Sequence, residues 1–186
     1  QESGRFHVAT NTGTRFDAGA VVIAGGVGSF QPRKLDVPGS AELEGKQVHY
    51  KVRDPQSYAG KDIVILGGGD SALDWALNLV QEGPHKAASV ILVHRRDGFR
   101  AAPASVAKMR ELCEALEMQF LVGQATGFEE RDGRLTGIKV TGGDAVTRLV
   151  PLDMLLVFFG LSPKLGPIAE WGLGIDFKHD MVTTEK

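Results

Sequence analysis

The stretch from Lys61 to Ala76 limits the fold of this chain more than any other, because it reads as a strand, a glycine turn and a helix. The run Ile63–Leu66 is short, apolar and rich in β-branched residues, which is typical of a buried parallel strand. Gly67, Gly69 and Ala72 fit the G-x-G-x-x-G/A spacing, which combines a tight turn, room for a pyrophosphate and a small residue where helix meets strand. The following helix would point free N–H groups at the turn, so the stretch predicts a phosphate-binding unit.

The composition excludes several classes of protein. A net charge of −2 over 186 residues provides no global field for nucleic acid or for an anionic membrane. No apolar run approaches the roughly 20 residues that span a bilayer, and no signal peptide is visible, so we expect no membrane partner and a cytoplasmic location. Cys113 is the only cysteine, which rules out a disulfide framework and a C-x-x-C redox pair within this sequence. The histidines are scattered and predict no metal site.

Strand and helix signals alternate after the glycine turn. Val90–Val93 and Met118–Val122 are further short apolar runs, and helical periods extend to about Glu82 and from Ala104 to Glu117. This alternation predicts a parallel sheet with right-handed crossovers. One face of each helix is expected in the core, namely Leu73, Ala76, Leu77 and Val80 on the first and Val106, Met109, Cys113 and Leu116 on the second.

The period changes after the third strand. Phe128–Arg131, Arg134–Thr141 and Ala145–Pro151 are separated by glycine-containing turns and read as a three-stranded antiparallel meander in place of a helical crossover. Met154–Phe159 then returns as a buried strand that ends at Gly160. The predicted fold class is therefore α/β, a Rossmann-like parallel sheet with an antiparallel three-stranded meander crossover.

Further β structure is predicted at both ends of the chain. Phe6–Thr10 and Thr14–Asp17 flank a turn and predict a hairpin, and Ala20–Ala24 reads as a buried strand that ends in a glycine cluster, Gly25–Gly28. That cluster is a poor phosphate fingerprint, because Pro32 follows it and no helical period does. A final hairpin is expected between Gly174–Phe177 and Met181–Thr183. Because the sequence opens at Gln1 in what reads as mid-strand and stops abruptly, we expect a fragment of a longer protein.

Cations follow the second strand of the glycine unit. An NAD site usually has an acid near this position to bind the ribose 2′-OH, whereas this strand is followed by His94, Arg95, Arg96 and Arg100. Guanidinium groups suit a 2′-phosphate, so the sequence favours NADP over NAD. The alternative is a solvated basic turn, which is what most charge runs are. His94 is left with two roles, donation to the phosphate or stacking on the adenine.

Asp70 and Ser71 lie within the glycine turn and admit two interpretations. They could contact the pyrophosphate or its waters, or they could cap the helix, for which both residue types are favoured. An aspartate that faces a phosphate directly would be unfavourable. No nucleophile–base pair has support in the sequence, and hydride transfer needs none.

These motifs together resemble a known family. Leu66–Ala76 and His94–Ala101 are similar to the NADPH-binding domain of thioredoxin-reductase-like flavoproteins. Lys46–Tyr50 and Leu165–Leu173 resemble more particularly the ferredoxin–NADP reductases of that type. The resemblance implies an FAD domain that is split in sequence, with an NADPH domain inserted in it.

The resemblance assigns segments and site residues. It implies a partial FAD-domain segment and connector at 1–45, an NADPH-binding domain at 46–177 and a return segment at 178–186, so that FAD-domain β segments flank the sheet. It places Gly67, Gly68, Gly69, Asp70, Ser71 and Ala72 along the pyrophosphate, His94, Arg95, Arg96 and Arg100 at the 2′-phosphate, and Gly160 near the nicotinamide half. The implied cofactors are NADP(H) for this chain and FAD for the full-length protein, with ferredoxin or flavodoxin as partner and a homodimer left open.

Two departures from the family pattern narrow the function. Thioredoxin reductases carry a C-x-x-C at about residues 50–60 of this sequence, where no cysteine occurs, so disulfide reduction by this chain is disfavoured. The family's first FAD fingerprint and its late Gly-Asp motif are also absent, so we expect the chain to bind NADP(H) and to hold FAD poorly. The alternatives left open are a related flavoprotein with another acceptor and a non-catalytic NADPH-sensing module.

Overall fold

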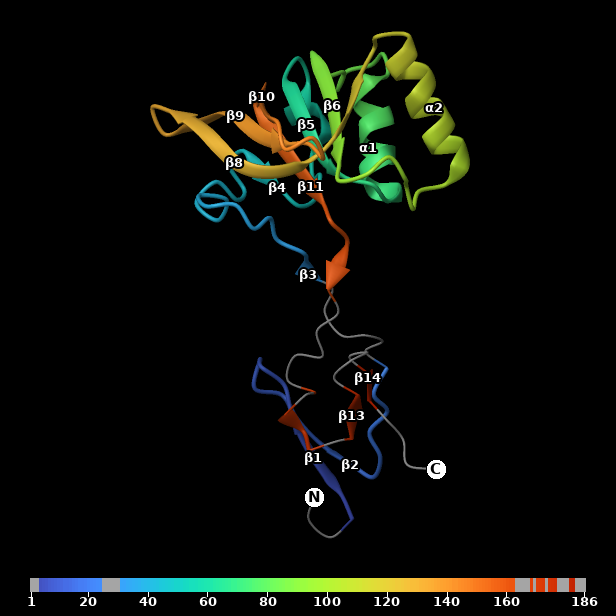
Figure 1. Cartoon of the computed structure of the whole chain (residues 1–186). Helices are drawn as coiled ribbons and strands as arrows, with labels where there is room; N and C mark the ends of the chain where they lie inside the picture. The colour runs from blue at the N-terminus through green and yellow to red at the C-terminus, as the bar shows by residue number, and fades with distance from the viewer. Residues whose placement is uncertain are drawn as a thin grey trace. The chain divides into compact units, whose positions relative to one another are not determined.

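The computed structural model describes residues 4–24, 31–162, 168, 170–172, 174–176 and 181–182 and divides into two units (Figure 1). The first unit comprises Gln1–Gln31 and Pro163–Lys186, and the second is Pro32–Ser162. In the first unit, β1 (Phe6–Ala9) and β2 (Arg15–Ala18) pair antiparallel, which confirms the predicted hairpin. β13 (Ile175–Asp176) and β14 (Met181–Val182) also pair antiparallel, as expected.

The prediction of a buried strand at Ala20–Ala24 is wrong for this structure. These residues adopt no strand, and Val22 is 88% exposed. An apolar run becomes a buried strand only when a neighbouring strand and a core cover it, and the described residues provide neither here. The glycine cluster Gly25–Gly28 lies outside the described residues.

The second unit is built on a five-stranded sheet in the order β4-β11-β5-β6-β7. All its pairings are parallel, with Leu66 of the central strand opposite Val93 and Val157. This arrangement confirms the predicted parallel sheet. The strands are β4 (Val48–His49), β5 (Asp62–Gly67), β6 (Ser89–His94), β7 (Gln119–Val122) and β11 (Met154–Phe158).

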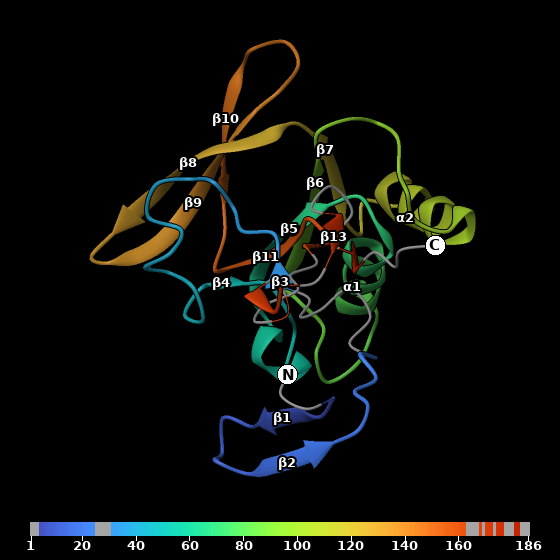
Figure 2. The same ribbon diagram turned by 90° about the horizontal axis from the view of Figure 1, so that it is seen from below.

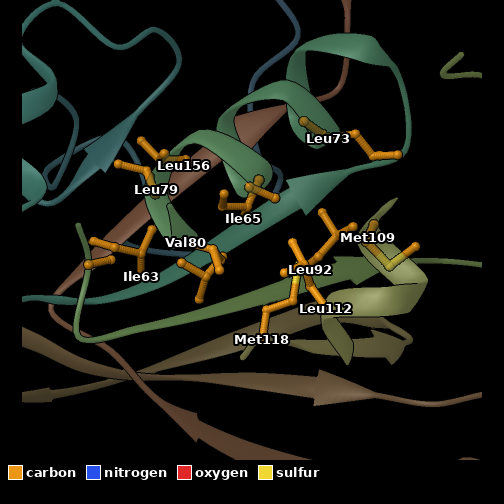
Figure 3. Close-up of a cluster of buried hydrophobic side chains, with 14 of the residues drawn as sticks. Ile63, Ile65, Leu73, Leu79, Val80, Leu92, Met109, Leu112, Met118 and Leu156 are labelled. Carbon is orange, nitrogen blue, oxygen red and sulfur yellow. The ribbon is translucent and has the colours of Figure 1, made fainter. Parts of the chain in front are cut away.

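Two helices cover one face of this sheet (Figure 2). α1 (Asp70–Val80) packs against β5 and β6, and α2 (Pro103–Glu114) packs against α1 and β7. The buried side chains of both helices share one core with Ile63 and Ile65 of β5 and Leu92 of β6, as Figure 3 shows. The residues predicted on the core-facing sides of the two helices are buried or packed against the core, with one exception. Leu116 is 90% exposed, because α2 ends at Glu114 and Leu116 has a φ of 60°, which turns it out of the helical period.

The antiparallel meander covers the other face of the sheet. It consists of β8 (Gln124–Arg131), β9 (Arg134–Thr141) and β10 (Thr147–Pro151), in the order β10-β9-β8. Ile138 of β9 packs in one core with Val64 and Leu66 of β5, which point away from the helices. A strand with both faces buried must be apolar throughout, which explains the uninterrupted run at Ile63–Leu66.

The connector before β4 contributes to the same core. Leu35, Val37 and Leu43 are buried against the meander side of the sheet. β3 (Gln31–Pro32) pairs with β12 (Leu161–Ser162), and the Arg33 N–H donates to the Gly160 carbonyl at 3.0 Å. A short 3₁₀ helix, η1 (Pro55–Tyr58), precedes β5. In the structure, residues 32–45 thus pack with the second unit, while the functional division at 45 and 177 stays a prediction.

Candidate functional site

A cavity of about 1060 Å³ lies at the carboxyl ends of the parallel strands within the second unit. This is the edge at which open α/β sheets bind ligands. Every residue that the sequence assigned to a cofactor lines the cavity: Gly67, Gly68, Gly69, Asp70, Ser71, Ala72, His94, Arg95, Arg96, Arg100 and Gly160. The fold therefore brings together segments from the ends of β5, β6 and β11, although their role in binding is a prediction.

The glycine turn between β5 and α1 has the geometry that its spacing predicts. A Cβ at Gly67 would lie 2.6 Å from the Phe158 carbonyl oxygen and 2.9 Å from the Cβ of Ala72, so strand, helix and β11 meet there too closely for any side chain. A Cβ at Gly69 would meet no atom within 4 Å. Gly69 is also the N-cap of α1, and no side chain caps the helix. Its open side and the free N–H groups of the first turn form a cradle for an anion.

Gly68 is required for a different reason. A Cβ at this buried position would lie 2.5 Å from Nε2 of His94, because the imidazole ring packs directly against the turn. The ring is also tilted against Phe99, with centroids 5.5 Å apart, and the ring centroids of Phe99 and Phe120 are 5.1 Å apart. The His94 side chain thus contacts both the glycine turn and an aromatic cluster.

The environment of His94 favours the neutral imidazole. Burial lowers the pKa of His94 below its usual value, and the charges of Arg95 and Arg96 lower it further, whereas a hydrogen bond with the Gly98 backbone acts in the opposite direction. A neutral ring can pack against Gly68 without adding a fourth positive charge to the arginine cluster beside it.

Arg95, Arg96 and Arg100 are exposed and line the cavity. Within the described residues, none of these three forms an ion pair. The neighbouring acid, Asp97, is bound instead by Arg110, with Nη2 and Oδ1 at 2.6 Å. Three cations that form no ion pair within the described residues are chemically suited to an anion with more than one negative charge.

Asp70 has a partner that neither sequence interpretation foresaw. Its Oδ1 accepts a hydrogen bond from the backbone N–H of Ala102 at 2.8 Å. The Gly68 carbonyl accepts a second bond, from the backbone N–H of Arg100, also at 2.8 Å. The glycine turn is therefore tied at two points to the loop that carries Arg100. Ser71 is exposed at the cavity edge.

Sequence reasoning missed a second set of cavity residues. Tyr50 lines the cavity beside β4, its hydroxyl accepts from the Leu35 N–H at 3.1 Å, and the ammonium of Lys34 lies 4.2 Å from its ring centroid. These side chains come from elements far apart in sequence, so no local motif marks them. The set also includes Arg33, Asp36, Lys51, Val52, Trp75, Gln124 and Phe159.

Other kinds of site find no support among the described residues. In the ranges that the structure describes, no three His, Cys, Asp or Glu side chains are grouped to hold a metal ion. In the part of the chain that the structure describes, no helix is long and apolar enough to cross a membrane.

The open turn at Gly69 and the guanidinium groups after β6, which form no ion pair within the described residues, are both chemically suited to phosphate groups.

Comparison with solved structures agrees with this architecture. The chain superposes on thioredoxin reductase from Lactococcus lactis with a TM-score of 0.79, at 21% identity, over 100% of this chain and 58% of that one. The thioredoxin reductase of T. acidophilum gives the same TM-score at 21% identity, over 95% of this chain and 55% of that one. At these identities the likeness shows the fold, which confirms the predicted fold class.

Sequence comparison is more specific. Over all 186 residues the chain is 68% identical to proteins named ferredoxin–NADP reductase from Methylibium petroleiphilum and from Albidiferax ferrireducens, and it covers 51% and 52% of their lengths. The chain thus spans about half the length of these relatives. The profile of the pyridine nucleotide-disulphide oxidoreductase family matches residues 1–183. The geometry of the site, the fold and this match agree, and the chain belongs to the pyridine nucleotide-disulphide oxidoreductase family.

Proposed function

We propose that this chain is the NADP(H)-binding part of an FAD-dependent ferredoxin–NADP reductase. One observation carries the proposal: an open glycine turn at a helix N-terminus shares a cavity with three guanidinium groups that have no acidic partner in the described residues. The first feature suits a pyrophosphate and the second a 2′-phosphate, and NADP(H) carries both on one ribose, the pyrophosphate at the 5′ position and the further phosphate at the 2′ position.

Each part of the cavity has a role in this proposal. The N–H groups of the first turn of α1 hold the pyrophosphate, and Gly69 keeps the approach open. Arg95, Arg96 and Arg100 bind the 2′-phosphate, and the neutral ring of His94 forms the wall between the two phosphate sites. Gly160 and its neighbours at the end of β11 lie on the side where the nicotinamide half extends. Bound NADPH would supply a hydride, and these residues bind and orient it.

The electron acceptors are proposed from the relatives. Proteins that share 68% identity with this chain are named ferredoxin–NADP reductase, which supports ferredoxin as the partner of the full-length protein. FAD as the hydride acceptor and flavodoxin as an alternative partner are proposed from the resemblance to thioredoxin-reductase-like flavoproteins. This chain covers about half of such a protein, so we expect it to bind NADP(H) without turnover. A homodimer and a cytoplasmic location remain predictions.

Calorimetric titration of the purified chain tests this function. NADPH is expected to bind at least about tenfold more tightly than NADH, because the 2′-phosphate adds charge-assisted hydrogen bonds. The double variant Arg95→Ala/Arg96→Ala should lose most of its NADPH affinity and little of its NADH affinity. The control Arg131→Ala/Arg134→Ala removes the same charge from the meander, outside the cavity, and should keep the preference.

Two outcomes would contradict the proposal. Equal losses for the two nucleotides in Arg95→Ala/Arg96→Ala would mean that these arginines do not bind the 2′-phosphate. A preparation that contains tightly bound flavin and oxidises NADPH on its own would show that this chain is more than a nucleotide-binding part.

A further inference from the structure

We infer that Asp70 is a positioning residue for cofactor selectivity: its carboxylate holds the loop that carries Arg100 against the glycine turn, and this places the cations that select a 2′-phosphorylated dinucleotide. The inference rests on the proposed function, since it takes NADP(H) as the ligand of the cavity. It assigns to Asp70 an indirect role, whereas the sequence suggested phosphate contact or helix capping.

The contacts of the loop support this role. Between the end of β6 and the start of α2, residues 95–102 form no helix or strand, so the loop depends on contacts from outside itself. Two backbone hydrogen bonds tie it to the glycine turn, from Arg100 N–H to the Gly68 carbonyl and from Ala102 N–H to Asp70 Oδ1, each at 2.8 Å. The Gly68 acceptor is a backbone carbonyl, which any residue would provide, whereas the Asp70 acceptor is a side-chain oxygen that a substitution can remove.

The charge of Asp70 is consistent with a positioning role and inconsistent with direct phosphate binding. A carboxylate beside a pyrophosphate repels it, whereas the same carboxylate at the first residue of α1 is stabilised by the free N–H groups and the dipole of the helix. Its bond to the Ala102 N–H is charge-assisted and therefore stronger than a neutral one. Asp70 thus holds the loop in place without contacting the nucleotide.

The backbone conformation at Ala102 allows the donor of this hydrogen bond, the Ala102 N–H, to be removed by substitution with proline. Ala102 has φ −54° and ψ 136°, and it precedes Pro103. Proline adopts such a φ and has no N–H, so Ala102→Pro deletes the donor at a position whose backbone already fits proline. Asp70→Ala deletes the acceptor. Because both variants remove one and the same hydrogen bond, their effects on selectivity should not add.

The experiment measures NADPH and NADH affinities of the chain by calorimetry. Asp70→Ala and Ala102→Pro should each lower the NADPH-to-NADH affinity ratio by about tenfold, as expected for one charge-assisted hydrogen bond, and the double variant should lower it no further. Asp70→Asn keeps an oxygen that accepts from the Ala102 N–H, so it should retain most of the ratio. The control Asp74→Ala removes the same charge from an exposed position further along α1, outside the cavity, and should leave the ratio unchanged.

A second measurement needs no nucleotide. Hydrogen exchange at the Ala102 amide should accelerate in Asp70→Ala and not in Asp74→Ala, because only the first loses the acceptor. Equal losses for NADPH and NADH, additive effects of the two variants, or an unchanged Ala102 amide would each overturn the inference. The wild-type titration tests the proposed function by itself: if the wild-type chain binds no NADPH, both the proposed function and this inference fail. If the wild-type chain prefers NADPH and the variants behave otherwise than expected, only this inference fails.

Discussion

Gly68 is an example of a residue whose identity is determined by a distant side chain. The fingerprint spacing leaves this position free, yet the ring of His94 occupies the space where a Cβ would be, 2.5 Å from Nε2. The same ring contacts Phe99, which limits how far it can retreat. The close approach of His94 to the turn therefore favours glycine at position 68, whereas position 67 faces a fixed backbone carbonyl and has a φ of 153°.

Gly68→Ala is expected to displace the His94 ring and to lower the free energy of unfolding by about 1–3 kcal/mol, the usual cost of overpacking. The loss is measured by urea denaturation. Adding His94→Ala removes the clashing ring, so the double variant Gly68→Ala/His94→Ala should be no less stable than His94→Ala alone. Gly143→Ala is the matched control, because a Cβ at Gly143 would meet no atom within 4 Å. An equal loss in both glycine variants would contradict the steric explanation.

At the scale of single residues, the sequence was a good guide where the chemistry is local. Gly67, Gly69 and Ala72 were predicted from their spacing, because the turn they form depends on neighbours in the chain. The partner of Asp70 was not predicted, since Ala102 lies 32 residues away and reaches it only through the packing of β6 and α2 beside α1. Tyr50 was missed as a cavity residue for the same reason.

Gln47 joins elements that the sequence shows only separately. Its side-chain amide donates to the carbonyls of Leu135 at 2.8 Å and Asp153 at 2.9 Å, and its side-chain oxygen accepts from the Leu135 N–H at 2.8 Å. Its own backbone carbonyl accepts from the N–H of Leu155. One glutamine before β4 thus connects the meander, the turn before β11 and β11 itself.

Gln47→Ala should therefore lower the free energy of unfolding by about 2 kcal/mol, because it leaves the partly buried Leu135 N–H and two carbonyls without their partner. Gln56→Ala is the control, since Gln56 is exposed in η1. Urea denaturation at one pH compares the two variants with the wild type. A Gln47→Ala variant as stable as the control would mean that water replaces these bonds without cost.

At the scale of elements, most strands and both helices followed from periodicity, because each has a continuous apolar face and a partner that covers it. Two predictions failed where that condition is missing. Ala20–Ala24 has the composition of a buried strand, but among the described residues nothing pairs with it. Leu116 continues the spacing of α2, but the helix ends before the residue is reached. Composition and period describe what an element needs and do not show whether the rest of the chain provides it.

For the whole molecule, the strand order determines how a dinucleotide would lie. The glycine turn follows β5, the arginines follow β6 on one side of it, and Gly160 follows β11 on the other. A nucleotide with its pyrophosphate at the turn would extend its 2′-phosphate end toward β6 and its nicotinamide end toward β11 and β4. All these segments belong to the unit Pro32–Ser162.

Hydrogen exchange with two ligands can test this orientation. NADPH should protect amides at residues 67–72 and 93–102 and also at 158–161, because it reaches both sides of the turn. The fragment 2′,5′-ADP contains only the phosphorylated adenosine half, so it should protect 67–72 and 93–102 and leave 158–161 unchanged. The hairpin Phe6–Ala18 has no residue at the cavity and serves as an internal control for both ligands. Protection of 158–161 by 2′,5′-ADP, with none at 93–102, would mean that the dinucleotide binds in the opposite direction and that the arginines after β6 do not hold its 2′-phosphate.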